Sequence, residues 1–244
     1  MTSGLDDLAQ RLVAAHDGGA LVGPIAPELV PANIEEVYAL QDRVIAHAGE
    51  VGGWKIMAGS EGEPLCAPVP ANRYFEDGAT LDAERHRHFL AEVEFAVKLG
   101  ADLLPGQPAE AAIASVHPVL ELIANPFVDR DATPRNIQLG DLQSNGAIVV
   151  GPALDRSIVE GLDTLNVGLL LDGNEVKTTD KGASWAAVVA ALEWLAPHAQ
   201  GRGMPLKAGQ VIITGSRVLA PLDAARTVIG TLGQAGRVSA RLTA

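Results

Sequence analysis

The chain has 244 residues, a formal net charge of −12 and 48% hydrophobic residues. This length and composition allow one large hydrophobic core. The strong acidity, without any dense Lys/Arg cluster, argues against a nucleic-acid partner, because phosphate binding needs a basic surface. The single cysteine, Cys66, excludes an intramolecular disulfide, argues against a cysteine-based zinc site, and favours a reducing cytoplasm as the location.

No targeting or membrane segment is expected. Asp6 and Asp7 stand where a secretion signal carries positive charge. The longest apolar runs, such as Val167 to Leu171, are the size of a strand. They are far shorter than the ~18 residues that a membrane helix needs.

Helical periodicity dominates the first fifty residues. Two apolar stripes with this period lie within them, the second from Ile34 to Ile45. The second helix has a clear start, because Asn33 followed by Glu36 is the cap pattern of a helix N-terminus. Residues 1–50 are therefore predicted to form a helical segment that packs on a β-rich unit, residues 51–244, within one structural unit.

From Val51 onward the pattern changes to short strands separated by Gly, Pro, Asn and Asp. One strong helix interrupts them, Trp185 to Ala196, and it is expected to end before Pro197. This is not the regular alternation of a doubly wound sheet, so the prediction is an α+β fold with a strand-rich core and an N-terminal helical layer. The expected strands are Gly53–Met57, Leu90–Leu99, Val116–Ile123, Ala147–Val150, Thr164–Leu171, Val211–Thr214 and Arg237–Leu242.

The most informative residues are three glutamates, Glu92, Glu94 and Glu121. The run from Ala91 to Leu99 alternates in polarity, which predicts a strand with Glu92 and Glu94 on one face. Glu121 lies inside an apolar run, where its charge would be buried. A buried carboxylate must be protonated, paired or bound to a metal. Ligation by oxygen atoms alone favours Mg2+ or Mn2+ over Zn2+.

Other readings of these residues stay open at this point. Glu92 and Glu94 alone also fit the solvated face of a half-buried sheet. Glu121 also fits a buried ion pair with an arginine or lysine. The pair His86 and His88 has charged neighbours, which favours a solvated loop over a metal site. Three further histidines are expected on helix surfaces: His16, His47 and His198.

Several motifs, in the same order, resemble one known family. The segment Ala91–Leu103 is similar to the metal-binding strand of the fumarylacetoacetate hydrolase superfamily. Glu121 as a third ligand narrows the resemblance to the branch of 2-keto-4-pentenoate hydratases and 4-oxalocrotonate decarboxylases. Further matches are the glycine-aromatic-lysine turn at Gly53–Ile56, the polar loop and strand at Gln143–Gly151, and the penultimate helix and strand at Trp194–Ala196 and Leu206–Ser216.

This resemblance implies an α+β fold built on a rolled, mixed β-barrel-like core, as in the C-terminal domain of fumarylacetoacetate hydrolase. It implies Mg2+ or Mn2+ on the three glutamates and a small 2-oxo or 2-hydroxydienoic acid as substrate. Polarisation of the 2-oxo group stabilises an enolate, so a metal-dependent lyase of aromatic meta-cleavage catabolism is expected. Hydration of a 2-hydroxy-2,4-dienoic acid is slightly preferred over decarboxylation of 2-oxo-3-hexenedioate (4-oxalocrotonate).

Roles for individual residues follow from the same resemblance. Lys55 is expected to transfer protons as the catalytic residue, because desolvation and a nearby cation can lower a lysine pKa toward neutrality. The plainer alternative is a lysine that only pairs with a glutamate. Ser144, Asn145 and Ser216 are expected to bind substrate or position water, with ordinary turn chemistry as the alternative.

Departures from the branch pattern indicate an altered pocket. Met57 replaces the usual glycine, and the Glu63–Asn72 loop lacks a counterpart of the family's aspartate. A partner subunit that keeps the metal site without turnover is therefore a competing reading. The family also implies a homo-oligomer, with a complex with a pathway neighbour as a further option. A dicarboxylic substrate would need a second cation, for which the candidates are Arg73, Arg135 and Arg217.

Overall fold

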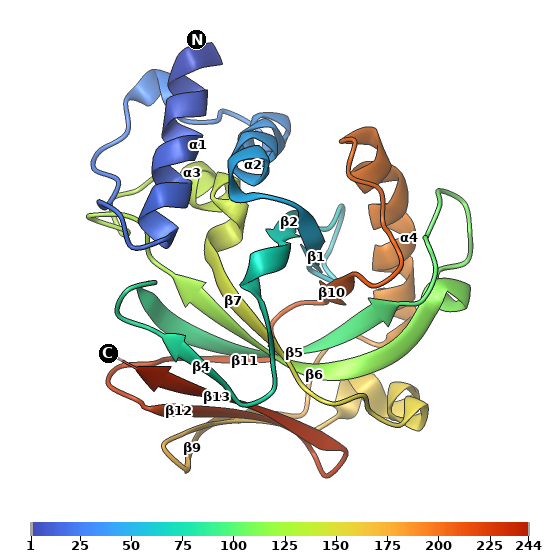
Figure 1. Cartoon of the computed structure of the whole chain (residues 1–244). Helices are drawn as coiled ribbons and strands as arrows, with labels where there is room; N and C mark the ends of the chain where they lie inside the picture. Colours follow the sequence, from blue (N-terminus) through green and yellow to red (C-terminus); the bar gives the residue numbers. More distant parts are fainter. Residues whose placement is uncertain (1, 244) are drawn as a thin grey trace.

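The computed structural model describes residues 2–243. The strands form two sheets, and the first is strongly curled (Figure 1). The first sheet has the order β2-β1-β10-β5-β6-β7-β3, with β11 paired to one half of β5, and the second has the order β4-β13-β12-β8-β9. The mixed α+β architecture with a curled, barrel-like sheet confirms the predicted fold class.

The first sheet consists of β1 (Val51–Ile56), β2 (Cys66–Pro70), β3 (Tyr74–Glu76), β5 (His88–Leu99), β6 (Ile113–Ala124), β7 (Asn145–Val150), β10 (Val211–Ile213) and β11 (Val218–Pro221). The second sheet consists of β4 (Ala79–Asp82), β8 (Val167–Leu171), β9 (Asn174–Thr179), β12 (Thr227–Leu232) and β13 (Gly236–Thr243). The α-helices are α1 (Thr2–His16), α2 (Ile34–Ala48), α3 (Arg135–Gly140) and α4 (Trp185–Gly201). Short 3-10 turns are Pro27–Leu29, Ala71–Arg73, Ala109–Ala112, Leu142–Ser144 and Arg156–Thr164.

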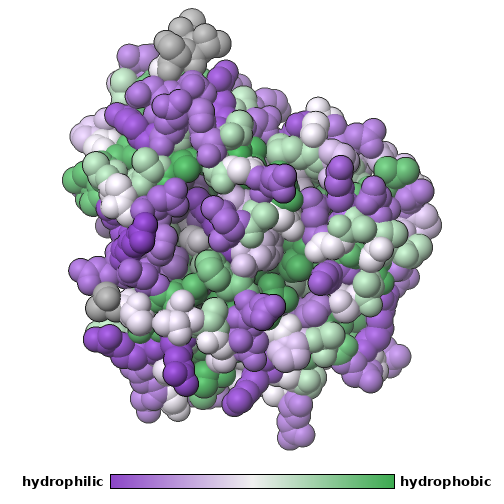
Figure 2. All heavy atoms as spheres, viewed as in Figure 1, coloured by the Kyte–Doolittle hydropathy of each residue, from purple (hydrophilic) through white to green (hydrophobic). Residues whose placement is uncertain are grey.

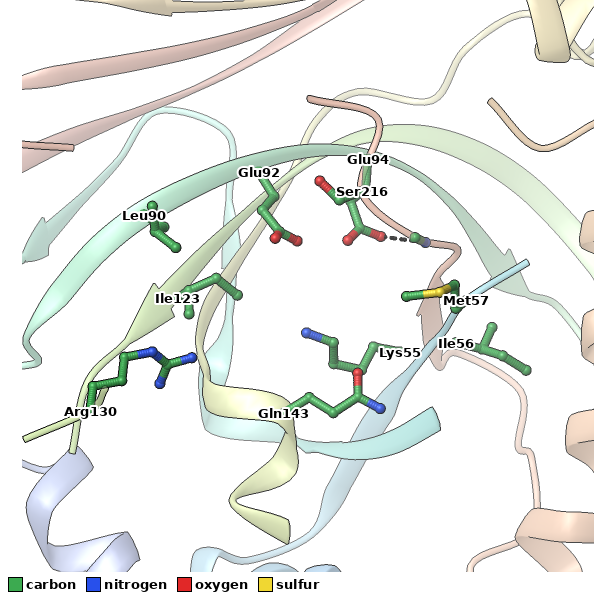
Figure 3. Close-up of a pocket in the computed structure, with 11 residues that line it drawn as sticks. Lys55, Ile56, Met57, Leu90, Glu92, Glu94, Ile123, Arg130, Gln143 and Ser216 are labelled. Carbon is green, nitrogen blue, oxygen red and sulfur yellow. Dashed lines mark hydrogen bonds between the residues drawn. The ribbon is translucent and has the colours of Figure 1, made fainter. Parts of the chain in front are cut away.

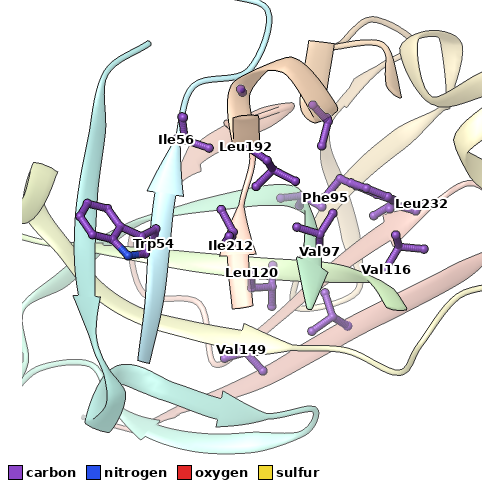
Figure 4. Close-up of a cluster of buried hydrophobic side chains, with 14 of the residues drawn as sticks. Trp54, Ile56, Phe95, Val97, Val116, Leu120, Val149, Leu192, Ile212 and Leu232 are labelled. Carbon is purple, nitrogen blue, oxygen red and sulfur yellow. The ribbon is translucent and has the colours of Figure 1, made fainter. Parts of the chain in front are cut away.

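The antiparallel pair β5 and β6 forms the centre of the molecule. Each strand has 12 residues, long enough to contact both sheets. Val93 and Leu120 face the second sheet, where a Cβ added at Gly230 would lie 2.9 Å from Val93 Cγ1 and 3.2 Å from Leu120 Cδ2. The main core therefore fills the space behind the hairpin, together with Trp54 and the buried face of α4 (Figure 4). Burial of this apolar surface is the main source of stability.

The N-terminal helices pack over one end of the first sheet. The buried Gln41 of α2 donates from Nε2 to the carbonyl oxygens of Cys66, at 3.1 Å, and Leu139, at 2.9 Å. His16, at the end of α1, lies with Nε2 2.8 Å from the buried Asp141 Oδ1. These polar contacts fix the helices on β2, which pairs with β1, and on the turn before β7.

Two predictions about histidines are wrong. His16 is only 5% exposed, because its contact with Asp141 draws the ring inward, and burial lowers its pKa. His88 does not lie in a solvated loop but begins β5, with its ring stacked on His86 at a centroid distance of 5.9 Å. Burial lowers the pKa of His88 to about 3, so this ring is held neutral.

Several element boundaries also differ from the predictions. Helix α4 continues through Pro197 to Gly201. Proline removes one backbone donor, but Pro197 lies on the exposed side while Ala199 still packs into the core, which favours continuation of the helix. The stretch Glu63–Asn72 is not only a loop, because β2 within it pairs with β1. The strands β3, β4, β9, β11 and β12 were not predicted.

The surface agrees with the acidic composition. Figure 2 shows a face covered mainly by hydrophilic side chains, with hydrophobic residues in smaller groups between them. Among the described residues, no helix combines the length and apolar character that crossing a membrane requires.

Candidate metal and substrate site

The three glutamates converge on one face of the central hairpin. The β5–β6 register places Glu92 directly opposite Glu121, and strand alternation places Glu94 on the same face as Glu92. One carboxylate oxygen from each residue lies within 4.8 Å of the others. Glu94 is 2% exposed and Glu121 is fully buried, so the reading of Glu92 and Glu94 as an ordinary solvated face is wrong.

The carboxylates repel one another in this arrangement. Burial, and then the charge of Glu121, raises the pKa of Glu92 to about 7. Burial and the charges of Glu121 and Glu92 raise the pKa of Glu94 well above its usual range. Both effects favour protonation, which a divalent cation between the three oxygens would oppose. Three close, buried carboxylates are the donor set that Mg2+ or Mn2+ prefers, so the residues present fit such an ion.

A short crossing segment between β10 and β11 holds Glu94 in place. The two strands pair with successive halves of β5, and residues 214–217 connect them past Glu94. The backbone N–H of Gly215 donates to Glu94 Oε2 at 2.8 Å (Figure 3). Gly215 has a φ of +110°, a left-handed conformation that favours glycine. The amide therefore orients one ligand oxygen of the predicted metal site.

Lys55 reaches the same site from β1. Its Nζ lies 2.6 and 2.7 Å from the two carboxylate oxygens of Glu121, and the residue is 9% exposed. Burial alone would lower the pKa of Lys55, but the charges of Glu121, then of Glu92 and Glu94, outweigh burial and raise it. The expected lowering is thus absent in this arrangement. Glu121 therefore forms the buried ion pair that the sequence left open as an alternative. Its partner is Lys55, the residue predicted to be catalytic.

The position of β1 depends on a close approach at Gly53. A Cβ there would lie 1.9 Å from the Val211 carbonyl oxygen of the parallel partner β10, and 2.4 Å from the Tyr74 hydroxyl. Only glycine allows the two strands to come this close. The motif Gly53–Ile56 therefore supplies both the glycine that allows this close packing and Lys55, which lines the cavity.

A cavity of about 230 Å3 opens in front of the glutamates. Its polar residues come from five separate stretches of the chain, and apolar side chains cover part of its wall (Figure 3). The residues that line it are Lys55, Ile56, Met57, Leu90, Glu92, Glu94, Ile123, Arg130, Gln143, Gly215 and Ser216. Met57, the departure noted in the sequence, is thus a wall residue of this cavity.

The three predicted substrate-binding residues have different positions. Ser216 lines the cavity beside Glu92 and Glu94. Asn145 is fully buried, and its Nδ2 donates to Glu121 Oε1 at 2.8 Å, so it contacts a glutamate directly. Ser144 is also buried, and its Oγ accepts from Arg130 Nη1 at 2.9 Å. Of these residues, only Ser216 is a wall residue of the cavity.

Two polar wall residues were not predicted. Gln143 enters the cavity from the turn Leu142–Ser144, whose φ values of 49°, 56° and 57° are left-handed. Three such non-glycine residues in a row are costly, and such strain concentrates at functional sites. Arg130 follows β6 and has no sequence motif around it. Gln143 begins the polar loop noted in the sequence, but its place in the cavity wall, like that of Arg130, depends on contacts between distant segments.

The candidates for a second cation are all outside this cavity. Arg73 lines a different cavity, of about 390 Å3, together with His16 and His88. Arg217 donates from Nε to the carbonyl oxygen of Lys181 at 2.9 Å, and Arg135 lies exposed at the start of α3. The arginine that does line the cavity of the glutamates is Arg130.

The fold and the arrangement of the glutamates can be compared with known proteins. A solved structure of 4-oxalocrotonate decarboxylase from Pseudomonas putida G7, complexed with calcium and acetate, superimposes with a TM-score of 0.80 over 100% of this chain and 98% of that chain, at 22% identity. A fumarylpyruvate hydrolase from Pseudomonas aeruginosa, in complex with Mn2+ and pyruvate, gives a TM-score of 0.55 over 78% and 88% of the chains, at 16% identity. The fold is therefore that of the fumarylacetoacetate hydrolase family.

Sequence comparison relates the chain to two kinds of enzyme within this fold. The chain is 28% identical to the 2-keto-4-pentenoate hydratase of Paraburkholderia xenovorans (strain LB400), over 91% of this chain and 87% of that one. It is 26% identical to a 4-oxalocrotonate decarboxylase of Pseudomonas sp., over 87% and 88%. No protein-family model matches the chain. The comparisons confirm the resemblance to the hydratase and decarboxylase branch, and with it the expectation of a metal-dependent lyase.

Proposed function

We propose that the chain is a divalent-metal-dependent lyase that hydrates a 2-hydroxy-2,4-dienoic acid, in the form of its 2-oxo tautomer. Glu92, Glu94 and Glu121 hold Mg2+ or Mn2+, and Lys55 is the catalytic residue. The observation that carries this proposal is the convergence of three carboxylates and one lysine, of which Glu92, Glu94 and Lys55 line a single cavity. The names of the sequence relatives and the metals of the similar structures support it.

The bound ion would polarise the 2-oxo group of the substrate and stabilise negative charge on the C2 oxygen. Lys55, in its charged form, would donate a proton to C5 of the dienol as the 2-hydroxyl proton leaves. Water then adds across the C3–C4 double bond, with its oxygen on C4 and a proton on C3. Ser216 and Gln143 line the cavity and can hydrogen-bond the substrate or this water.

Decarboxylation of 2-oxo-3-hexenedioate is a second candidate function, because Arg130 gives the cavity a further cation. In this reaction the C5–C6 bond breaks, CO2 leaves, and the electron pair moves through the conjugated chain to the C2 oxygen. The product is again a dienol, which Lys55 could protonate or leave unchanged. Both reactions therefore use the same metal and the same lysine.

An ultraviolet assay tests the proposal and separates the two reactions. Purified protein is given 2-hydroxypenta-2,4-dienoate or 2-oxohex-3-enedioate, with Mg2+ or with a chelator, while CO2 is monitored. Loss of dienoate absorbance with Mg2+ and without CO2 is the expected result for a hydratase. Release of CO2 from the dicarboxylate would identify a decarboxylase. No reaction of either compound would contradict both proposed reactions and would point to a different substrate or to a partner subunit without turnover.

A further inference from the structure

A second cavity, of about 390 Å3, opens beside the start of β7. Its walls come mainly from the end of α1, the turn Ala71–Arg73, β4 and the residues around the start of β5. Among the described residues, none lines both this second cavity and the cavity of the glutamates. The proposed function therefore leaves the second cavity without a role, and a ligand in it must be recognised by other side chains.

A buried arginine, Arg73, lines the second cavity. It is 8% exposed, and its Nη1 donates to the backbone carbonyl oxygen of Asn145. Within residues 2–243, no carboxylate oxygen lies within 4.0 Å of its guanidinium nitrogens. Removal from water disfavours an unpaired charge, and burial accordingly lowers the pKa of Arg73. A guanidinium stays charged in proteins and has five N–H donors, so four remain for a ligand that enters the cavity.

His16 adds a hydrogen-bond acceptor to the same cavity. Its Nε2 lies 2.8 and 3.1 Å from the two carboxylate oxygens of the buried Asp141. An ionised carboxylate only accepts, so Nε2 carries the proton and Nδ1 of the neutral ring is an acceptor. Burial lowers the pKa of His16, which favours this neutral ring. Within residues 2–243, Nδ1 has no hydrogen-bond partner, because both side-chain contacts of His16 are made by Nε2.

Two acidic side chains, Asp17 and Asp82, also line the second cavity. Asp17 is exposed, and Asp82 is partly exposed, with its Oδ1 accepting from the Arg85 backbone N–H at 2.8 Å. Water screens such charges more strongly than the charge of a buried arginine. Among the described residues, the acidic and histidine side chains of this cavity form no group of three ligand atoms within 4.8 Å, as the glutamates do. The second cavity therefore favours an anion over a metal ion.

We infer that the second cavity binds inorganic phosphate in a protonated form, with its charged oxygens on Arg73 and its remaining hydroxyl group on His16 Nδ1. At neutral pH, inorganic phosphate carries both negative charge and at least one O–H donor. The planar fork of arginine matches phosphate in a bidentate manner. The hydroxyl group satisfies the buried acceptor of His16, which an anion without a proton would leave unpaired.

Sulfate is the matched probe, because it has the same tetrahedral shape but no O–H donor at neutral pH. Binding of phosphate and of sulfate is measured by titration calorimetry on the full chain with saturating Mg2+, at constant ionic strength. The first variant is Arg73→Gln, with Arg237→Gln on β13 as its control. The second is Asp17→Asn, with Asp180→Asn as its control. Arg237, Asp17 and Asp180 are all exposed, so these changes should not disturb the fold.

The unmodified chain and both controls should bind phosphate, and should bind sulfate at least about tenfold more weakly. Arg73→Gln should weaken phosphate binding by on the order of tenfold to a hundredfold, the range for a hydrogen bond between charged groups, with its circular dichroism unchanged. Asp17→Asn should tighten phosphate binding by about twofold to fivefold, because it removes an exposed negative charge from the cavity wall.

Absence of phosphate binding, or equal affinity for phosphate and sulfate, would overturn the inference. Unchanged phosphate affinity in a folded Arg73→Gln protein would also overturn it, because phosphate would then bind elsewhere, for example on the Mg2+ of the glutamates. If Arg73→Gln does not fold, unchanged affinity in Asp17→Asn has the same meaning. Each of these results leaves the proposed hydration standing, because the two cavities have different lining residues.

Discussion

At the scale of single residues, the most consequential contact joins Lys55 to Glu121. A lysine that pairs with a metal-ligating carboxylate can serve two purposes: it can balance charge, or it can move a proton. The contact distances of 2.6 and 2.7 Å are compatible with both. The two roles differ in what is lost when the amine is removed. Charge balance affects binding of the ion, whereas proton transfer affects turnover.

The change Lys55→Ala should therefore reduce turnover by about a hundredfold or more, the usual contribution of a general acid or base, while Mg2+ binding is retained. Steady-state rates and metal titration on the same preparation check this. Lys98→Ala is the matched control, because Lys98 is an exposed lysine on β5. Near-normal rates for Lys55→Ala would remove Lys55 from the mechanism.

At the scale of elements, the parallel pairing of β1 with β10 positions Lys55. This pairing brings the backbone of Gly53 against Val211, where no Cβ can fit. The glycine is thus a structural requirement of the site, two residues before its lysine. Any side chain at this position must push the two strands apart or displace the Tyr74 hydroxyl.

We expect Gly53→Ala to lower the free energy of unfolding by about 2 kcal/mol or more, because the overpacked strand cannot relax without moving β10. Urea unfolding followed by circular dichroism measures this change. The control is Gly201→Ala at the end of α4, where an added Cβ meets nothing within 4 Å. A Gly53→Ala protein as stable as the unmodified chain would show that the close approach is not rigid.

Local patterns predicted the elements that carry a strong signal of their own. The alternation around Glu92 and Glu94 predicted their shared face, and the Asn33 cap predicted the start of α2, where its side chain accepts from the Glu36 backbone N–H at 2.9 Å. Short edge strands such as β3 and β9 carry too few residues for a clear period. The continuation of α4 past Pro197 was missed because burial of Ala199 is a tertiary effect.

The candidate site was predictable only in part. Acidic residues in apolar runs are visible in one sequence, so the glutamates were found. Their convergence depends on the register of two strands, which places Glu92 opposite Glu121. Arg130 gave no signal, and Gln143 was noted only as the start of the polar loop, because their relation to the glutamates exists only after the chain has folded. The division of the chain at residue 50 and the homo-oligomeric state stay predictions.

At the scale of the whole molecule, a strongly acidic protein is proposed to bind an acidic substrate. The formal charge of −12 disfavours the approach of an anion at long range. Inside the cavity, Lys55, Arg130 and a divalent ion would reverse the local potential. The fold forms this cavity by bringing together residues from β1, β5, the segment after β6, and the connection between β10 and β11.

The central claim is that Glu92, Glu94 and Glu121 hold one divalent ion, and titration of Mn2+ into the unmodified chain and Glu94→Gln tests it most directly. Glu160→Gln, an exposed glutamate in the turn Arg156–Thr164, is the matched control. The unmodified chain and the control should each bind one ion, whereas Glu94→Gln should bind at least about tenfold more weakly with its circular dichroism unchanged. Equal Mn2+ affinity in all three proteins would contradict the three-glutamate site.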